Sequence, residues 1–134
     1  MFVLDTNTLV YFFRGSGNVA TRLLSVAPAD VAVPAVVVYE LETGIAKSTD
    51  PAKRRGQLDQ LLRAVTVLPF GLDEAKAAAG VRARLETEGT PMGPIDTLIA
   101  GTALARRGVL VTRNVREFGR VAGLAVENWY GDSA

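Results

Sequence analysis

Two residue types that dominate enzyme chemistry are missing from this chain, which has neither cysteine nor histidine among its 134 residues. The lack of cysteine excludes disulfides, thiolate zinc sites and cysteine nucleophiles. The lack of histidine excludes nucleases and hydrolases that are built on imidazole acid–base chemistry, and His-ligated zinc enzymes. If the protein is an enzyme, carboxylates, hydroxyls, Arg or Lys must do the chemistry, and we expect a hard metal ion that accepts oxygen ligands.

A strong charge imbalance and a long apolar run are missing as well. The chain carries 15 Lys and Arg against 14 Asp and Glu, so its composition does not point directly to nucleic acid. No stretch reaches the roughly 18 apolar residues that would span a bilayer. Residues 1–13 lack the basic leader and the cleavage site of a signal peptide, and Asp5 interrupts their apolar run. We therefore expect a cytoplasmic protein without a membrane partner.

Short apolar runs alternate with helical patterns, which predicts one α/β domain over residues 1–134 with a mainly parallel sheet. Pro34 suits the first turn of a helix, and Gly108 suits a helix end. The last four residues, Gly-Asp-Ser-Ala, should be frayed. The predicted strands are 2–4, 31–33, 66–68, 109–111 and 124–126, and the predicted helices are 6–13, 18–27, 35–47, 53–64, 72–88 and 95–107.

Polar residues follow two of the predicted strands. Asp5 comes directly after the first strand, and Thr112, Arg113 and Asn114 follow the strand Val-Leu-Val. In open parallel sheets, ligands bind beyond the carboxyl ends of the strands. If the two strands are neighbours, their polar ends meet at one edge. This favours a ligand site over the simpler alternative, in which Asp5 or Thr6 only caps the next helix.

Asp96 is a second candidate, in a helix whose first turn contains Pro94. A carboxylate near the third helical position also favours the helix dipole, so a purely structural role is an alternative. At 3.6 residues per turn, however, Asp96 shares its stripe with Ile99, Ala100 and Ala103. We therefore expect Asp96 to face inward or along a groove, which favours a functional role.

Glu40 and Glu42 compete for a third place in such a site. Both lie in the predicted helix 35–47, and each shares a face with apolar residues. Their positions along the helix do not show which of the two belongs to the site, and we expect the remaining one to be solvated. The charges at 53–55 and at 82–84 read most simply as solvated helix faces.

Four motifs together resemble the PIN domain of VapC-type toxins. They are LDTN at 4–7, YELETG at 39–44, GPIDTLIAG at 93–101 and LVTRNVREFGRVAGLAVENW at 110–129, and they cover nearly the whole chain. The last two resemble the enteric-type VapC branch most. The resemblance implies a three-layer α/β/α fold with a central parallel sheet of about five strands, and a homodimer. It also implies a ribonuclease that depends on Mg²⁺ or Mn²⁺ and is restrained by a VapB antitoxin.

Carried over residue by residue, the resemblance assigns the metal-binding acids to Asp5, Glu40 and Asp96 and so selects Glu40 over Glu42. Clustered carboxylates repel one another and are held together by a divalent cation. Such a cation activates water to hydrolyse RNA, which leaves a 5′-phosphate and a 3′-hydroxyl. The branch resemblance points to the anticodon loop of initiator tRNA as the target.

The resemblance also names supporting residues. Thr6 or Thr112 would hydrogen-bond within the site, and Asn7 would orient the first carboxylate. The fourth acidic position of the family falls on Asn114, a neutral residue, which argues against a fully occupied second metal position. Glu117 is the nearest acid that could replace it, and a helical turn over NVREF would place Asn114 and Glu117 on one face. Both are therefore candidate catalytic residues.

Two other interpretations remain open from the sequence. The segment FVLDTNT also resembles the first motif of haloacid-dehalogenase phosphatases, with Asp5 as nucleophile and Asn7 in place of the second acid. The chain lacks that family's later Lys and paired acids. A catalytically inactive α/β binding module is the second alternative. Metal-dependent RNA cleavage by the wild type, lost in Asp5→Ala, would separate these interpretations.

Overall fold

The structure is a computed structural model that describes residues 1–131. Its centre is a five-stranded sheet in the order β3-β2-β1-β4-β5, and all four neighbouring pairs are parallel. The predicted α/β class with a five-stranded parallel sheet is therefore confirmed. The strands are β1 (Phe2–Leu4), β2 (Val31–Pro34), β3 (Thr66–Leu68), β4 (Val109–Val111) and β5 (Ala125–Glu127).

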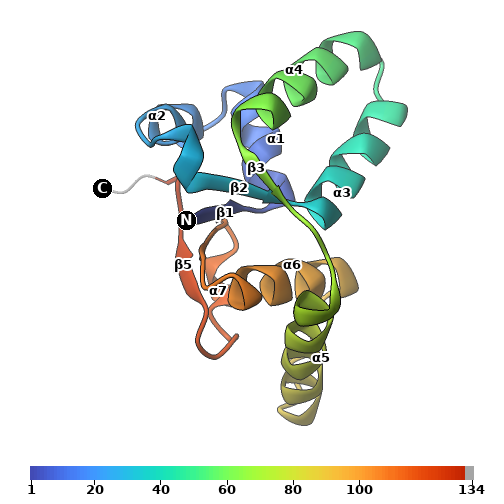
Figure 1. Ribbon diagram of the computed structural model, residues 1–134, viewed down its shortest axis with the longest axis vertical. Coiled ribbons are helices and arrows are strands. Elements are labelled where there is room, and N and C mark those ends of the chain that lie inside the picture. The colour runs from blue at the N-terminus through green and yellow to red at the C-terminus, as the bar shows by residue number, and fades with distance from the viewer. Residues whose placement is uncertain (132–134) are drawn as a thin grey trace.

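Helices cover both faces of this sheet. Figure 1 shows α1, α2 and α4 on one side and α5, α6 and α7 on the other, with α3 running outward beside α4. The central strands β1, β2 and β4 are accordingly buried from both sides, which explains their continuous apolar runs. The helices are α1 (Thr6–Arg14), α2 (Val19–Leu24), α3 (Ala35–Ala46), α4 (Pro51–Ala64), α5 (Leu72–Thr87), α6 (Pro94–Ala105) and α7 (Val115–Phe118), with a short 3₁₀ turn η1 (Pro28–Asp30).

The strand order places a topological switch between β1 and β4. The chain first builds outward from β1 through β2 to β3, then crosses over and continues on the other side with β4 and β5. Helices that follow strands on either side of such a point diverge, which leaves a crevice at the carboxyl ends of the two central strands. The fold therefore provides a ligand position where Asp5 and Thr112 lie.

Several helices and strands begin or end at residues other than the predicted ones, for local reasons. The helix predicted over 18–27 ends at Leu24, because Ser25 turns back and its Oγ donates to the Arg22 carbonyl at 2.6 Å. Pro34 belongs to β2 and precedes the first turn of α3 rather than lying in it. The last strand is shifted by one residue relative to 124–126.

Gly108 has a different role from the predicted one. The residue with positive φ after α6 is Arg107 (φ 54°), whereas Gly108 has an ordinary φ. A Cβ atom at Gly108 would lie 2.6 Å from Val3 Cγ2, so this glycine permits the close approach of the chain to β1.

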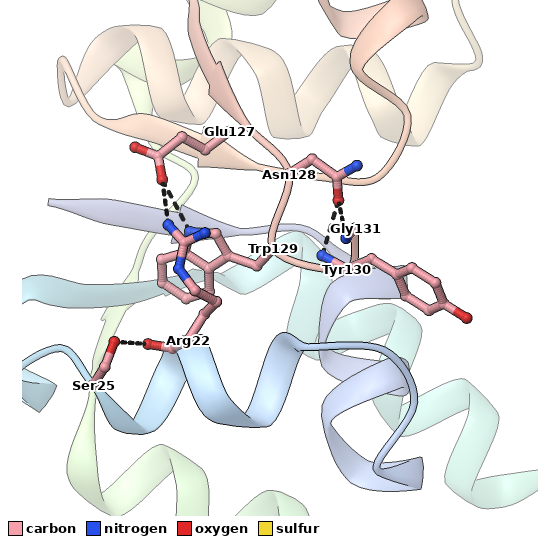
Figure 2. A network of polar contacts seen from close by, with 7 residues as sticks. All are labelled: Arg22, Ser25, Glu127, Asn128, Trp129, Tyr130 and Gly131. Carbon is pink, nitrogen blue, oxygen red and sulfur yellow. Dashed lines mark hydrogen bonds and ion pairs between the residues drawn. The ribbon is translucent and has the colours of Figure 1, made fainter. Parts of the chain in front are cut away.

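Polar contacts hold the C-terminal segment against α2 (Figure 2). The buried Trp129 donates from its indole Nε1 to Glu127 Oε1 at 3.0 Å, and Arg22 Nη2 lies 3.3 Å from the same oxygen. Gly131 accepts a hydrogen bond from Asn18 Nδ2 at 2.8 Å, so this residue of the tail is held in place. The rest of the tail that was predicted to be frayed, residues 132–134, lies outside the described residues.

Candidate active site

The two predicted strand ends lie side by side. β1 and β4 pair directly, with Leu4 in register with Val111, and the Asp5 N–H donates to the Val111 carbonyl at 3.2 Å. Asp5 and Thr112 are the first residues after these strands, and both are buried. The prediction that polar residues of the two strands meet at one sheet edge is therefore confirmed.

Asp5 combines the two roles that the sequence presented as alternatives. It is the N-cap of α1, and its Oδ1 accepts the Thr8 N–H at 2.9 Å. It is also only 5% exposed, which is unusual for a capping carboxylate. Burial raises the pKa of Asp5, hydrogen bonds from Thr112 and Thr8 oppose this rise, and the nearby charge of Glu40 adds to it. The capping bond thus fixes the position of a carboxylate whose charged form is destabilised by burial and by the charge of Glu40.

The described contacts give no support to the prediction that Asn7 orients Asp5. Asn7 is exposed, and within residues 1–131 it makes no hydrogen bond to Asp5. Thr8 takes this role through its backbone N–H, while its Oγ1 donates to the Val111 carbonyl at 3.1 Å. The sequence contained a signal for Thr8, because a capping side chain bonds the N–H two or three residues further on.

Glu40 and Glu42 have separate environments. The Thr6 hydroxyl donates to Glu40 Oε1, which brings the N-terminus of α1 and the middle of α3 together. Glu42 forms a bidentate ion pair with Arg55 of α4. Glu40 therefore belongs to the sheet edge and Glu42 does not, and Arg55 is paired rather than simply solvated.

Asp96 is the third residue of α6 and is half-buried. Its stripe neighbours Ile99, Ala100 and Ala103 are fully buried, so the prediction that Asp96 faces inward or along a groove is confirmed. The pKa of Asp96 is raised to about 6, first by desolvation and then by the charges of three other carboxylates. In order of effect, these are Glu117, Asp5 and Glu40.

Asn114 and Glu117 form a pair at the same edge. The short helix α7 begins after Asn114, as the predicted turn over NVREF requires, and Asn114 Nδ2 donates to Glu117 Oε2 at 2.7 Å. The Asn114 N–H donates to Thr112 Oγ1 at 3.0 Å, which connects this pair to the environment of Asp5. Glu117 lies within electrostatic reach of Asp96 and is not merely solvated.

These side chains have the right chemistry for a hard divalent cation. All four acids offer carboxylate oxygens, which Mg²⁺ and Mn²⁺ prefer. A cation would relieve the repulsion that, after desolvation, raises the pKa of Asp96. Within residues 1–131, no three acidic side chains already lie close enough to hold one ion together. Mg²⁺ commonly keeps several waters and is held by one or two protein carboxylates, which this arrangement allows.

The titration of Asp96 leads to a prediction for the metal-free protein. Its carboxyl group keeps a proton up to a pH of about 6 in the folded state but has an ordinary pKa of 3.8. The folded state thus binds more protons between these values, and its free energy of unfolding falls as the pH rises through this range. Because Asp96 is half exposed, we expect this contribution to be at most about 2 kcal/mol.

Urea unfolding in EDTA between about pH 4 and pH 7 measures this contribution. In Asp96→Asn the loss of stability with rising pH should be smaller than in the wild type. In Asp73→Asn, which removes an exposed first-turn acid of α5, it should be unchanged. Equal pH dependence in the wild type and Asp96→Asn would contradict the assignment.

None of the helices among residues 1–131 is both long enough and apolar enough to cross a bilayer.

Comparisons with known proteins were consistent across sequence and structure. The pattern of the PIN domain family matches residues 2–124. The chain is 31% identical to the tRNA(fMet)-specific endonuclease VapC of Salmonella typhimurium over 96% of this chain and 97% of that protein. It is 30% identical to ribonuclease VapC2 of Rickettsia felis over 96% and 98%.

Solved structures show the same relationship. The DNA-bound VapBC of Salmonella typhimurium superposes with a TM-score of 0.89 at 32% identity, covering 96% of this chain and 97% of that one. VapBC2 of Rickettsia felis, bound to a DNA fragment from its promoter, gives a TM-score of 0.88 at 31% identity, covering 96% and 98%. With the strand order and the acidic sheet edge described above, these matches show that the chain belongs to the VapC family of PIN-domain proteins.

Proposed function

We propose that this chain is an endoribonuclease that depends on Mg²⁺ or Mn²⁺, and that it is the toxin of a VapB–VapC pair. The observation that carries the proposal is the meeting of four acids at one sheet edge, where burial and then the charges of Glu117, Asp5 and Glu40 raise the pKa of Asp96. The names of the relatives from Salmonella and Rickettsia, an endonuclease and a ribonuclease, support the same activity.

Asp5, Glu40 and Asp96 would hold the cation. When bound, a divalent cation lowers the pKa of water and stabilises the negative charge that develops on a phosphodiester. The protein prepares its ligands before the cation arrives. Thr8 and Thr112 hold Asp5 in place, and Thr6 holds Glu40, so that less side-chain freedom is lost on binding. Without histidine, the proposed chemistry uses only these oxygen donors.

Asn114 and Glu117 would act beside this set. We propose that Asn114 orients a water molecule by hydrogen bonding and that Glu117 helps to hold a second cation or its water shell. Their 2.7 Å contact keeps the amide and the carboxylate together at the site edge.

This role predicts opposite shifts in metal dependence. Glu117→Gln removes one negative charge and should raise the Mg²⁺ concentration for half-maximal cleavage by about tenfold, in the range of outer-shell metal partners. Asn114→Asp adds a carboxylate and should lower this concentration. Metal titrations of cleavage by both variants measure the effect. If neither curve moved, the Asn114–Glu117 pair would be structural, and the site would rest on Asp5, Glu40 and Asp96.

The proposed substrate and partners follow from the relatives. The Salmonella and Shigella relatives are named tRNA(fMet)-specific endonucleases, which favours initiator tRNA as the substrate. We propose the anticodon loop as the place of cleavage, on the branch resemblance of the sequence. Solved neighbours are VapBC complexes, which favours a VapB-type antitoxin as partner. The homodimer is proposed on the family resemblance of the sequence. A cationic antitoxin side chain, Arg or Lys, should lie near Asp5, Glu40 and Asp96, because their negative charge attracts one.

Incubation of the purified chain with initiator tRNA tests the proposal. Cleavage should require Mg²⁺ or Mn²⁺, stop in EDTA, leave 5′-phosphate ends and slow when the antitoxin is present. The absence of RNA cleavage with either metal would favour the inactive binding module. Hydrolysis of p-nitrophenyl phosphate without RNA cleavage would favour the phosphatase, an interpretation that the family membership opposes.

A further inference from the structure

A groove of about 360 Å³ leads away from the candidate active site between α1, α3 and α4. Thr6 and Glu40 line it where it meets the sheet edge, and Arg14 lines it at the other end of α1. Thr6 and Arg14 are eight residues apart on one helix, a distance of about 12 Å along its axis at 1.5 Å per residue. Arg54 on α4 also lines the groove, whose walls include apolar side chains such as Phe13 and Leu58.

The two arginines in this groove have no carboxylate partner among the described residues. Within residues 1–131, the guanidinium group of Arg14 makes no ion pair or hydrogen bond, and that of Arg54 donates only to the neutral side chain of Gln57, at 2.9 Å. Five other arginines are each paired with a carboxylate, namely Arg22, Arg55, Arg82, Arg84 and Arg106. The groove therefore carries two guanidinium groups that form no ion pair within residues 1–131, and one acid of the site, Glu40, lines it.

We propose that this groove carries the RNA strand next to the cleaved bond, and that Arg14 and Arg54 bind phosphates of flanking nucleotides. The inference rests on the proposed ribonuclease function. Arg14 is too far along α1 to contact the phosphate that reacts beside Thr6 and Glu40, so it meets a different one. Guanidinium groups bind phosphate oxygens in pairs. The apolar walls with Phe13 suit unpaired bases, as in other grooves that bind single strands. Arg14 and Arg54 are thus positioning residues and not catalytic ones.

Charge-removing substitutions test this assignment. We expect Arg14→Gln and Arg54→Gln each to raise KM for initiator tRNA by about tenfold, the usual effect of losing one hydrogen bond to a charged group, and to leave kcat unchanged. The matched control is Arg63→Gln. Arg63 lies on the same helix as Arg54, is exposed and has no carboxylate partner within residues 1–131, but it does not line the groove.

Salt dependence distinguishes phosphate binding from a general loss of structure. Binding of a fluorescein-labelled single-stranded oligoribonucleotide is measured by anisotropy in EDTA, over a range of salt concentrations. Each phosphate contact with a single strand contributes about 0.7 to the slope of log affinity against log salt. The double variant should therefore lose about 1.4 of this slope. Arg14→Lys and Arg54→Lys should restore most of it, and Arg63→Gln should resemble the wild type.

The outcomes separate this inference from the proposed function. If the wild type cleaves RNA and the double variant matches it in KM and salt slope, the groove assignment is wrong while the ribonuclease stands. If the wild type cleaves no RNA but the double variant still loses RNA affinity and salt slope, the groove assignment stands and the ribonuclease fails. Loss of antitoxin binding with unchanged RNA binding would assign the groove to the protein partner and overturn the inference.

Discussion

Replacing Asp96 by Asn is expected to reduce RNA cleavage by about a hundredfold to a thousandfold, because a cation that is held less well stabilises less of the negative charge in the transition state. The amide keeps the shape of the side chain but lacks the charge that attracts a divalent cation. Calorimetric titration with Mn²⁺ should therefore also show weakened metal binding. The metal-free variant should melt at a higher temperature than the wild type near pH 7, because repulsion from Glu117, Asp5 and Glu40 is removed.

Asp73→Asn is the matched control for this experiment. Asp73 lies in the first turn of α5 as Asp96 lies in the first turn of α6, but it is exposed and does not contribute to the site. Its replacement should lower the free energy of unfolding by about 0.3–1 kcal/mol, because its interaction with the helix dipole is lost. Cleavage and metal binding should be unchanged. If Asp96→Asn retained Mg²⁺-dependent cleavage, Asp96 would have only this dipole role, and the proposed site would be wrong.

The packing of α5 against α6 gives the largest expected loss of stability. A Cβ atom at Gly101 of α6 would lie 2.6 Å from the backbone N and Cα and from the Cβ of Ala78 on α5. Backbone atoms cannot rotate away, so Gly101→Ala must push the helices apart. Such overpacking costs about 1–3 kcal/mol and more in rigid sites, which exceeds the gain of about 1 kcal/mol in helix propensity. Because α6 also carries Asp96, the displacement should reduce metal affinity as well.

Gly80→Ala separates the gain in helix propensity from the cost of overpacking. Gly80 lies within α5, and a Cβ atom there would have nothing within 4 Å. This change should therefore stabilise the protein by about 1 kcal/mol through helix propensity alone. Urea unfolding of both variants measures the difference. Stabilisation by Gly101→Ala would show that α5 and α6 do not approach as closely as the structure has them.

Local sequence patterns were sufficient to find most of the elements. Runs of three apolar residues predicted β1, β3 and β4 within their observed bounds, and the spacing of apolar residues predicted α3, α4, α5 and α6. These features depend on neighbours within one or two turns of the chain. The predicted bounds were wrong where a side chain formed a local hydrogen bond that competes with the helix. At the end of α2, for example, the Ser25 side chain donates to the Arg22 carbonyl.

The sequence also identified the acids, but it required a family resemblance to choose between Glu40 and Glu42. Both have the same helical environment, and only the position of α1 and α4 around α3 separates them. Thr6 of α1 reaches Glu40, and Arg55 of α4 reaches Glu42. Thr8 was not identified from the sequence for a similar reason, because the bond from Thr8 Oγ1 goes to Val111, more than a hundred positions away on another strand.

By itself, the sequence therefore determined the class of fold, the oxygen-only chemistry and the candidate acids, because composition and short-range periodicity are properties of the chain alone. Only the tertiary structure decided that β1 lies beside β4 and that four acids share one edge. It also decided that Arg14 and Arg54 line the groove that begins at Glu40. The strand pairing, the acidic site and the groove each bring together residues that are tens of positions apart in the sequence. Their formation depends on which faces of several helices pack together, and many weak contacts together determine that packing.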